Sequence, residues 1–225
     1  MSPLIQMDDK GEEKMGKAAN SSISLKQIHV TDNFWNKYVH LVKDVIIPYQ
    51  WDILNDKLED VETSHCIENF KIAAGEKEGE FQGAVFQYTD VGKWLEAVGF
   101  VLNYERDEKL EELADETIEL IGRAQQPDGY LNTYFTIKEP DGRWSNLMEG
   151  HELYTAGHMI EAAVAYYEAT GKRRFLEIVS KFADLVCQTF GSEEGKIHGY
   201  PGHQEIELAL VKLYRVTREK KYLDL

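Results

Sequence analysis

Two histidines occupy matching places in the sequence. His151 follows Gly150 and His203 follows Gly202, and each stands where an apolar helix is expected to begin. Asp90 holds the same place before a third such helix. An imidazole can donate a hydrogen bond to a sugar hydroxyl or accept one from it, and helix N-termini add oriented N–H groups. The alternative is capping, because aspartate is a good N-cap and a histidine beside a glycine can satisfy backbone groups.

Glutamates recur inside the same helices. Glu96, Glu161 and Glu207 hold equivalent positions. Paired carboxylates are what glycoside hydrolysis needs, but a glutamate two turns into a helix more often bonds a neighbouring turn or an arginine. His158 and Glu161 have the spacing of metal ligands, yet the sequence shows no third ligand beside them and no H-E-x-x-H motif. We therefore favour a structural role for the glutamates and expect no metal.

Aromatic residues near these positions have two interpretations. Trp94, Trp144 and Tyr154 can stack against sugar faces, although such residues more often belong to the core. The sequence has no G-x-G-x-x-G, P-loop or G-x-S-x-G motif, and no cysteine paired to a nearby histidine. Cys66 and Cys187 are too far apart for a disulfide framework or a zinc knuckle.

The elements that position these residues are predicted to be helix pairs. Residues 150–171 are apolar on most faces, which indicates a buried helix, and an amphipathic helix follows over 175–190. Such a pair favours an inner and an outer layer. Residues 96–110, 161–176 and 207–223 each hold an apolar helix, a charged turn and the start of another helix. Repetition at this period is typical of stacked αα-hairpins, as a solenoid or a closed ring.

Strands are minor in this pattern, so the predicted fold class is all-α with minor short β segments. Residues 24–30 alternate weakly and residues 130–137 are β-prone. Asp32 can cap a helix that Pro48 should kink or end. The last outer helix is about one turn long where the sequence stops at Leu225. Because so short a helix has no independent stability, we expect a truncated chain or fragment.

Composition excludes several function classes. The net charge of -15 argues against nucleic acid and anionic membranes as partners, because both would repel the chain. Residues 1–20 lack the apolar stretch of a secretory signal, and no apolar run reaches membrane-spanning length. These features predict a cytoplasmic protein. Residues 1–22 are rich in Lys, Glu, Gly and Ser and are expected to form a disordered lead-in.

Several long motifs resemble glycoside hydrolase family 127, the β-L-arabinofuranosidases. They are HELYTAGHMIEAAVAY at 151–166, GKIHGYPGHQEIELAL at 195–210, AQQPDGYL at 124–131, IPYQW at 47–51 and FQYTDVGKWLE at 86–96. The resemblance extends from about residue 25 to the end of the sequence.

The resemblance implies an (α/α)6 toroid followed by β-sandwich domains, in a chain several hundred residues longer. It also implies a retaining hydrolase whose cysteine nucleophile lies in a zinc site of three cysteines and one glutamate, with another glutamate as acid/base. Those residues belong to the later part of the family's chain, and Cys66 and Cys187 stand in other contexts. We therefore expect no catalytic residue and no metal ligand here, with zinc bound in the full-length family through residues that this chain lacks.

The resemblance implies that this chain contributes one wall of the family's sugar pocket. His151 and His203 match histidines that bind the arabinofuranose, and Asp90 joins them as a candidate binding residue. The family's pocket glutamine has no clear counterpart between Asp56 and His65. We thus expect residues 23–225 to be the N-terminal part of an (α/α)6 catalytic toroid, truncated at its C-terminus.

The expected partners are an arabinofuranoside-type sugar and the missing C-terminal portion of the chain. Without a thiolate there is no nucleophile, so the 225-residue chain alone is expected to be inactive. The alternative from another class is a non-catalytic αα-repeat module that binds a carbohydrate or a protein. Other (α/α)6 enzymes, such as lyases or epimerases, are a further alternative.

Overall fold

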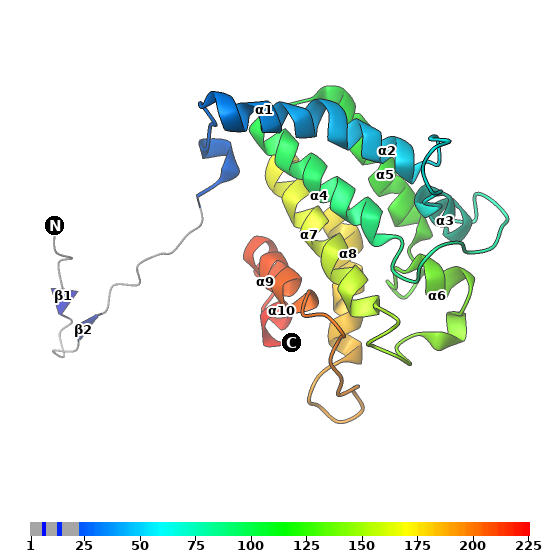
Figure 1. The fold of residues 1–225 in the computed structure, drawn as a ribbon. Coiled ribbons are helices and arrows are strands. Elements are labelled where there is room, and N and C mark those ends of the chain that lie inside the picture. Colours follow the sequence, from blue (N-terminus) through cyan, green and yellow to red (C-terminus); the bar gives the residue numbers. More distant parts are fainter. Residues whose placement is uncertain (1–5, 8–12, 15–22) are drawn as a thin grey trace.

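The computed structural model describes residues 6–7, 13–14 and 23–225 (Figure 1). Most of the predicted disordered lead-in, residues 1–22, lies outside the described residues. Two short strands in it, β1 (Gln6–Met7) and β2 (Glu13–Lys14), pair in an antiparallel manner. Apart from an isolated bridge between Phe190 and Ile197, the other regular elements among the described residues are helices, so the all-α prediction is confirmed.

The helices are joined by connections of different lengths, and the two longest precede α4 and α9. In chain order they are the 3-10 turn η1 (Leu25–Gln27), α1 (Asn33–Leu41), the π-helical turn η2 (Val42–Ile46), α2 (Ile47–Leu54), α3 (Cys66–Ala73), α4 (Thr89–Tyr104), α5 (Glu108–Ala124), α6 (Thr133–Ile137), the 3-10 turn η3 (Pro140–Gly142), α7 (Glu152–Thr170), α8 (Arg174–Thr189), α9 (Ile206–Thr217) and α10 (Lys221–Asp224).

Helix α7 is the centre of the arrangement. It packs against α4, α8 and α9, and Figure 1 shows it running between α4 and α9. Thirteen of its residues are buried, and Ala156, Ile160 and Ala163 are fully inaccessible. This burial follows from its apolar surface, which has no wide polar face to present to solvent. The pairs α4–α5, α7–α8 and α9–α10 form the predicted hairpins, with α4, α7 and α9 side by side.

The two central helices approach each other closely because of a glycine. A Cβ atom added to Gly99 of α4 would lie 2.9 Å from the carbonyl carbon of Ala165 and 2.9 Å from the backbone nitrogen of Tyr166 on α7. Helix backbones cannot move aside as a side chain can. Gly99 therefore permits the short distance between α4 and α7.

We expect Gly99→Val to lower the free energy of unfolding by about 2–3 kcal/mol, since it overpacks a backbone contact. Gly122→Val in α5 is the control, because an added Cβ there meets only the side-chain atoms of Arg174 and Ile178. Urea unfolding followed by circular dichroism measures both. A loss at Gly122 as large as that at Gly99 would contradict this account.

Two predicted β segments are wrong. Residues 24–30 contain the 3-10 turn η1, and residues 130–137 contain α6. In the second case, the Asn132 side chain accepts a hydrogen bond from the Phe135 backbone N–H at 3.1 Å. This cap begins a helix where β-branched and aromatic residues favour a strand, so local capping and packing outweigh propensity.

Pro48 does not end its helix. It lies in the first turn of α2, and the preceding residues, 42–46, form the π-helical turn η2. Proline lacks an N–H and its ring crowds the carbonyl one turn earlier, so the wider turn takes up the disturbance. The predicted irregularity therefore occurs just before Pro48.

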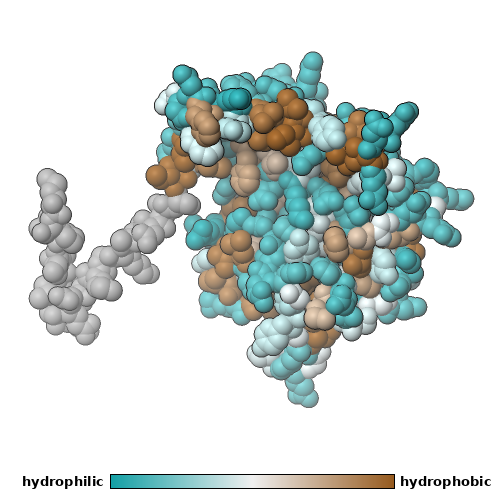
Figure 2. All heavy atoms as spheres, viewed as in Figure 1, coloured by the Kyte–Doolittle hydropathy of each residue, from teal (hydrophilic) through white to brown (hydrophobic). Residues whose placement is uncertain are grey.

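Apolar side chains gather on the outer surface of α1, η2 and α2 (Figure 2). Eight of them are exposed: Phe34, Trp35, Tyr38, Leu41, Val42, Val45, Ile46 and Tyr49. Helix α1 has no buried residue, and the core of the described chain begins at Ile47.

At the other end of the chain, α10 is four residues long and is anchored by buried Tyr222, whose hydroxyl donates to Asp184 at 2.6 Å. No helix among the described residues is long and apolar enough to cross a membrane.

Candidate functional site

His151 and His203 come together although 51 residues separate them in the sequence. Their ring centroids are 5.2 Å apart. His151 immediately precedes α7, and His203 lies in the turn before α9. Because α7 and α9 pack side by side, the segments that lead into them meet at one end of the inner layer. The matching positions in the sequence correspond to neighbouring positions in space.

The conformation of His151 fixes its ring chemistry. Its φ of 54° is in the left-handed region, and its Nδ1 lies 2.7 Å from the carbonyl oxygen of Glu149. A carbonyl only accepts, so Nδ1 donates, and in the neutral ring Nε2 is then an acceptor for an incoming hydroxyl. The ring makes no capping hydrogen bond to α7. The side chain therefore does not cap α7, but it does satisfy a backbone group, the Glu149 carbonyl, as the alternative interpretation expected.

Two aromatic rings complete the group, which we call the imidazole cluster: His151, His203, Tyr154 and Phe86. The Tyr154 ring centroid lies 5.7 Å from that of His151 and 5.1 Å from that of His203. The Phe86 centroid is 5.1 Å from that of His151, and this side chain is 42% exposed. The cluster thus combines hydrogen-bonding rings with an exposed apolar face.

Phe86 was not predicted from the sequence. It belongs to the FQYTDVGKWLE motif, but nothing in its spacing distinguishes it from a core residue. Tyr154 was predicted only as one of several aromatics, and its role as the ring between two histidines depends on the turn before α9 folding back onto α7.

Asp90 lies in a neighbouring cavity of about 870 Å³, beside Gln87, Lys93 and Trp94. It is the second residue of α4 and not its N-cap, and it accepts a hydrogen bond from Gln87 Nε2 at 3.2 Å. Burial raises the pKa of its carboxyl, and Lys93 opposes that effect. Lys93 also lines the cavity and lies 3.2 Å from the Tyr154 hydroxyl. Lys93 therefore connects the Asp90 cavity to the imidazole cluster.

A buried carboxyl supports the segment that presents His151. Glu152 accepts hydrogen bonds from the Tyr130 hydroxyl and from the Trp144 backbone N–H, the latter at 2.7 Å. Burial raises the pKa of Glu152 to about 7. Arg143 lies over the Tyr130 ring at 3.9 Å. These contacts hold residues 144–151 against the core, so His151 projects from a fixed position.

Two of the three glutamates predicted on the inner helices, Glu96 and Glu161, have structural partners. Glu161 forms an ion pair with Lys212 of α9, and Glu96 lies 3.8 Å from the same ammonium. Glu207 is exposed on α9. Helix α9 thus supplies one cation that joins the carboxylates of α4 and α7, which agrees with the structural interpretation of Glu96 and Glu161.

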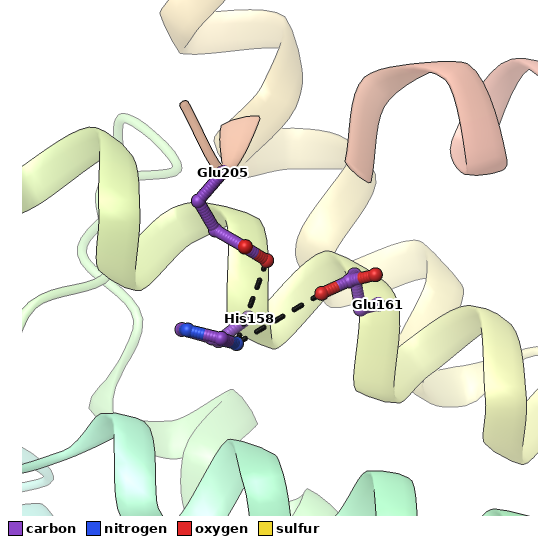
Figure 3. A group of neighbouring side chains, drawn as sticks. All are labelled: His158, Glu161 and Glu205. Atoms are coloured by element: carbon purple, nitrogen blue, oxygen red, sulfur yellow. Dashed lines mark ion pairs between the residues drawn. The ribbon is translucent and has the colours of Figure 1, made fainter. Parts of the chain in front are cut away.

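His158 and Glu161 do have a third neighbour, contrary to the expectation from sequence. Glu205, from the turn before α9, points toward both of them, and ligand-type atoms of the three residues lie within 4.8 Å of one another (Figure 3). The sequence could not show this, because Glu205 is 44 positions away from Glu161. The ammonium of Lys212 already stands beside Glu161, where a cation would otherwise balance its charge.

Neither cysteine is an activated nucleophile. Cys66 is buried, its Sγ donates to the Gln87 carbonyl oxygen at 2.9 Å, and burial raises the pKa of its thiol. Burial also raises the pKa of the Cys187 thiol, which lies near the Lys221 carbonyl oxygen at 3.7 Å. Both side chains are therefore thiols at neutral pH, and the thiolate is the nucleophilic form.

Helix pairs in two layers, with imidazole and aromatic rings gathered at one end of the inner layer, define an all-α protein of stacked αα-hairpins with a polar and aromatic site. Residues 27–225 match the family model described as β-L-arabinofuranosidase, GH127 catalytic domain. The chain belongs to this family of glycoside hydrolases.

Individual relatives agree with this assignment. The chain is 45% identical to the non-reducing end β-L-arabinofuranosidase of Bifidobacterium longum subsp. longum, over 88% of this chain and 32% of that protein. It is similar to the crystal structure of a GH127 β-L-arabinofuranosidase from Geobacillus stearothermophilus T6, with a TM-score of 0.85 and 63% identity over 86% of this chain and 31% of that one. A GH127 β-arabinofuranosidase structure gives a TM-score of 0.82 at 38% identity, over 90% and 32%. The chain thus spans about a third of the length of these relatives.

Proposed function

We propose that this chain is the N-terminal segment of a retaining β-L-arabinofuranosidase and supplies one wall of its sugar pocket. The observation that carries the proposal is the 5.2 Å separation of the His151 and His203 rings at the same end of two adjacent inner helices. A furanose presents hydroxyls on neighbouring carbons, and two rings at this separation can reach two of them. Nε2 of His151 accepts from one hydroxyl, since its Nδ1 is engaged by Glu149.

The aromatic residues and Asp90 extend this wall. Phe86 offers an exposed apolar face beside His151 for the C–H groups of the sugar. Asp90, in the neighbouring cavity, is placed to accept a hydrogen bond from a more distant hydroxyl of the glycan. We further propose that the helix pairs continue into an (α/α)6 ring, in which α4, α7 and α9 are inner helices.

The nucleophile and the zinc site belong, in this proposal, to the remaining part of such an enzyme. The residues described in this chain do not fit a site of three cysteines and one glutamate. Cys66 and Cys187 are the chain's two cysteines, and each is held at a separate place by its own carbonyl contact. The segment therefore binds and orients the sugar and carries out no bond cleavage.

The test uses p-nitrophenyl β-L-arabinofuranoside and two proteins. Residues 1–225 alone are expected to release no p-nitrophenol above background, because the chain has no thiolate. The second protein joins residues 27–225 to the remainder of the Geobacillus relative, which is 63% identical over the matched part. This chimera is expected to hydrolyse the substrate.

Either of two results would contradict the proposal. Robust turnover by residues 1–225 would show that the chain holds its own nucleophile. A folded chimera without turnover would show that this segment does not supply a working wall of the pocket. For substitutions of the site histidines in this chimera, His198→Ala is the matched control. His198 is an exposed histidine that lines a different cavity.

A further inference from the structure

Three side chains from α7 and the turn before α9, His158, Glu161 and Glu205, point at one another (Figure 3), and His158 lies beside Tyr154 of the imidazole cluster. His158 Nδ1 lies 3.4 Å from Glu205 Oε1 and 3.9 Å from Glu161 Oε2. A carboxyl oxygen of Glu205 also lies within 4.8 Å of a carboxyl oxygen of Glu161. Two ionised carboxylates this close would repel each other, which favours a proton on one of them.

The surrounding charges decide which carboxyl holds that proton. Glu96 and Lys93 of α4 and Lys212 of α9 are the other charged groups that act on this set of side chains. Lys212 pairs with Glu161, which favours the ionised form there. Burial and the neighbouring charge of Glu161 raise the pKa of Glu205 to about 8. Glu205 therefore carries the proton at neutral pH, and Glu161 carries the negative charge.

His158 is neutral in the same range. Burial is the main cause that lowers its pKa to about 4, and the Lys93 charge adds to it. The set at neutral pH is thus a neutral imidazole, a neutral Glu205 carboxyl and the Glu161–Lys212 ion pair. This arrangement avoids two unpaired buried charges, which would be costly between packed helices.

The same residues fix the turn that presents His203. A Cβ atom added to Gly157 of α7 would lie 3.1 Å from the Glu205 carbonyl carbon and 3.2 Å from its oxygen, so the start of α9 rests directly on α7. Glu205 is two positions after His203. Tyr154, whose ring contacts His203, also packs edge-on against His158 with centroids 4.5 Å apart.

We propose that Glu205 is a positioning residue for the sugar site: its carboxyl, placed against His158 and Glu161, seats the turn before α9, so that His203 lies against Tyr154 and His151. The step from this geometry to sugar binding rests on the proposed function. The contact is present while Glu205 is protonated. It is lost as the pH rises through about 8, when the carboxyl ionises beside Glu161.

The test compares three variants of residues 1–225 with the unaltered chain. Glu205→Gln keeps a neutral hydrogen-bonding group, Glu205→Ala removes it, and Glu207→Gln is the control at an exposed carboxylate two residues later, in α9. Infrared spectroscopy detects a protonated carboxyl, and NMR detects the nuclear Overhauser effect between the ring protons of Tyr154 and His203. Both are measured at pH ~6 and pH ~10, on either side of the Glu205 pKa.

The unaltered chain and Glu207→Gln should show the protonated-carboxyl band and the Overhauser effect at the lower pH and lose both at the higher pH. Glu205→Gln should lack the band of Glu205 but keep the Overhauser effect at both pH values. Glu205→Ala should lose the effect at both. If that variant does not fold, the comparison of the unaltered chain with Glu205→Gln still decides the matter.

Three results would overturn the proposal. They are a protonated-carboxyl band at the lower pH that Glu205→Gln leaves undiminished, an Overhauser effect that Glu205→Ala leaves intact, and stoichiometric zinc binding that disappears in Glu205→Gln. Zinc binding of this kind would show that a cation, and not a proton, lies between the carboxyl groups of Glu161 and Glu205. Neither spectroscopic measurement uses sugar or turnover. A failed proposed function would therefore leave the placement of His203 by Glu205 standing, and the reverse also holds.

Discussion

Replacing Trp94 with alanine is expected to lower the free energy of unfolding by about 4 kcal/mol, the upper range for truncating a buried aromatic side chain. Trp94 is 2% exposed and lies on α4, where its ring packs against Trp51 of α2 with centroids 4.5 Å apart. Its indole N–H donates to the Ile47 carbonyl oxygen at 3.1 Å. The alanine variant therefore loses packing, an aromatic pair and a hydrogen bond at once. Guanidinium unfolding followed by circular dichroism measures the change.

Trp94→Phe separates these contributions. It retains most of the packing but leaves the Ile47 carbonyl without its donor, which costs about 1–3 kcal/mol for a buried acceptor. We expect its stability to lie between those of the unaltered chain and Trp94→Ala. If both variants lost the same free energy, the indole hydrogen bond and not the packing would be the main link between α2 and α4. If neither lost stability, Trp94 would not belong to the core.

The sequence allowed the arrangement of the inner layer to be predicted, because burial leaves a clear mark on a helix. Residues 150–171 lack a polar face, and the structure buries most of α7. The matching positions of His151 and His203 predicted that they would lie near each other, since equivalent ends of adjacent helices meet. Both inferences depend on patterns that can be seen along the sequence itself: the apolar surface of one helix and the repeated position of a histidine before a helix.

Other features depend on contacts that local patterns do not record. Glu205 joins His158 and Glu161 only because the turn before α9 folds onto Gly157. Glu152 follows His151 in the sequence and reads as an ordinary first-turn acid, yet Tyr130 and Trp144 bury it. The left-handed φ of His151 is also hidden, because a histidine carries no sign of it as a glycine would.

The left-handed backbone of His151 gives a way to separate its structural role from its role in binding. In the chimera that joins residues 27–225 to the remainder of the Geobacillus relative, we expect His151→Gly to lower kcat/KM by about 10- to 100-fold. Losing a hydrogen bond to a buried sugar hydroxyl costs ~1.4–2.7 kcal/mol of binding to the transition state. Glycine adopts a φ of 54° without the steric cost of a side chain, which offsets the loss of the Glu149 hydrogen bond and of the ring contacts, so the thermal midpoint should change little.

Measured together, kcat/KM and the thermal midpoint of His151→Gly distinguish a binding role of the imidazole from a purely structural one. If His151 served only to shape the turn before α7, glycine would replace it without loss, and kcat/KM would be unchanged. If the ring mattered only for packing against Phe86 and Tyr154, the thermal midpoint would fall together with activity. A large fall in kcat/KM at a little-changed midpoint is expected only if the imidazole contacts the sugar. His198→Ala in the same chimera should alter neither quantity, because that exposed histidine lines a separate cavity.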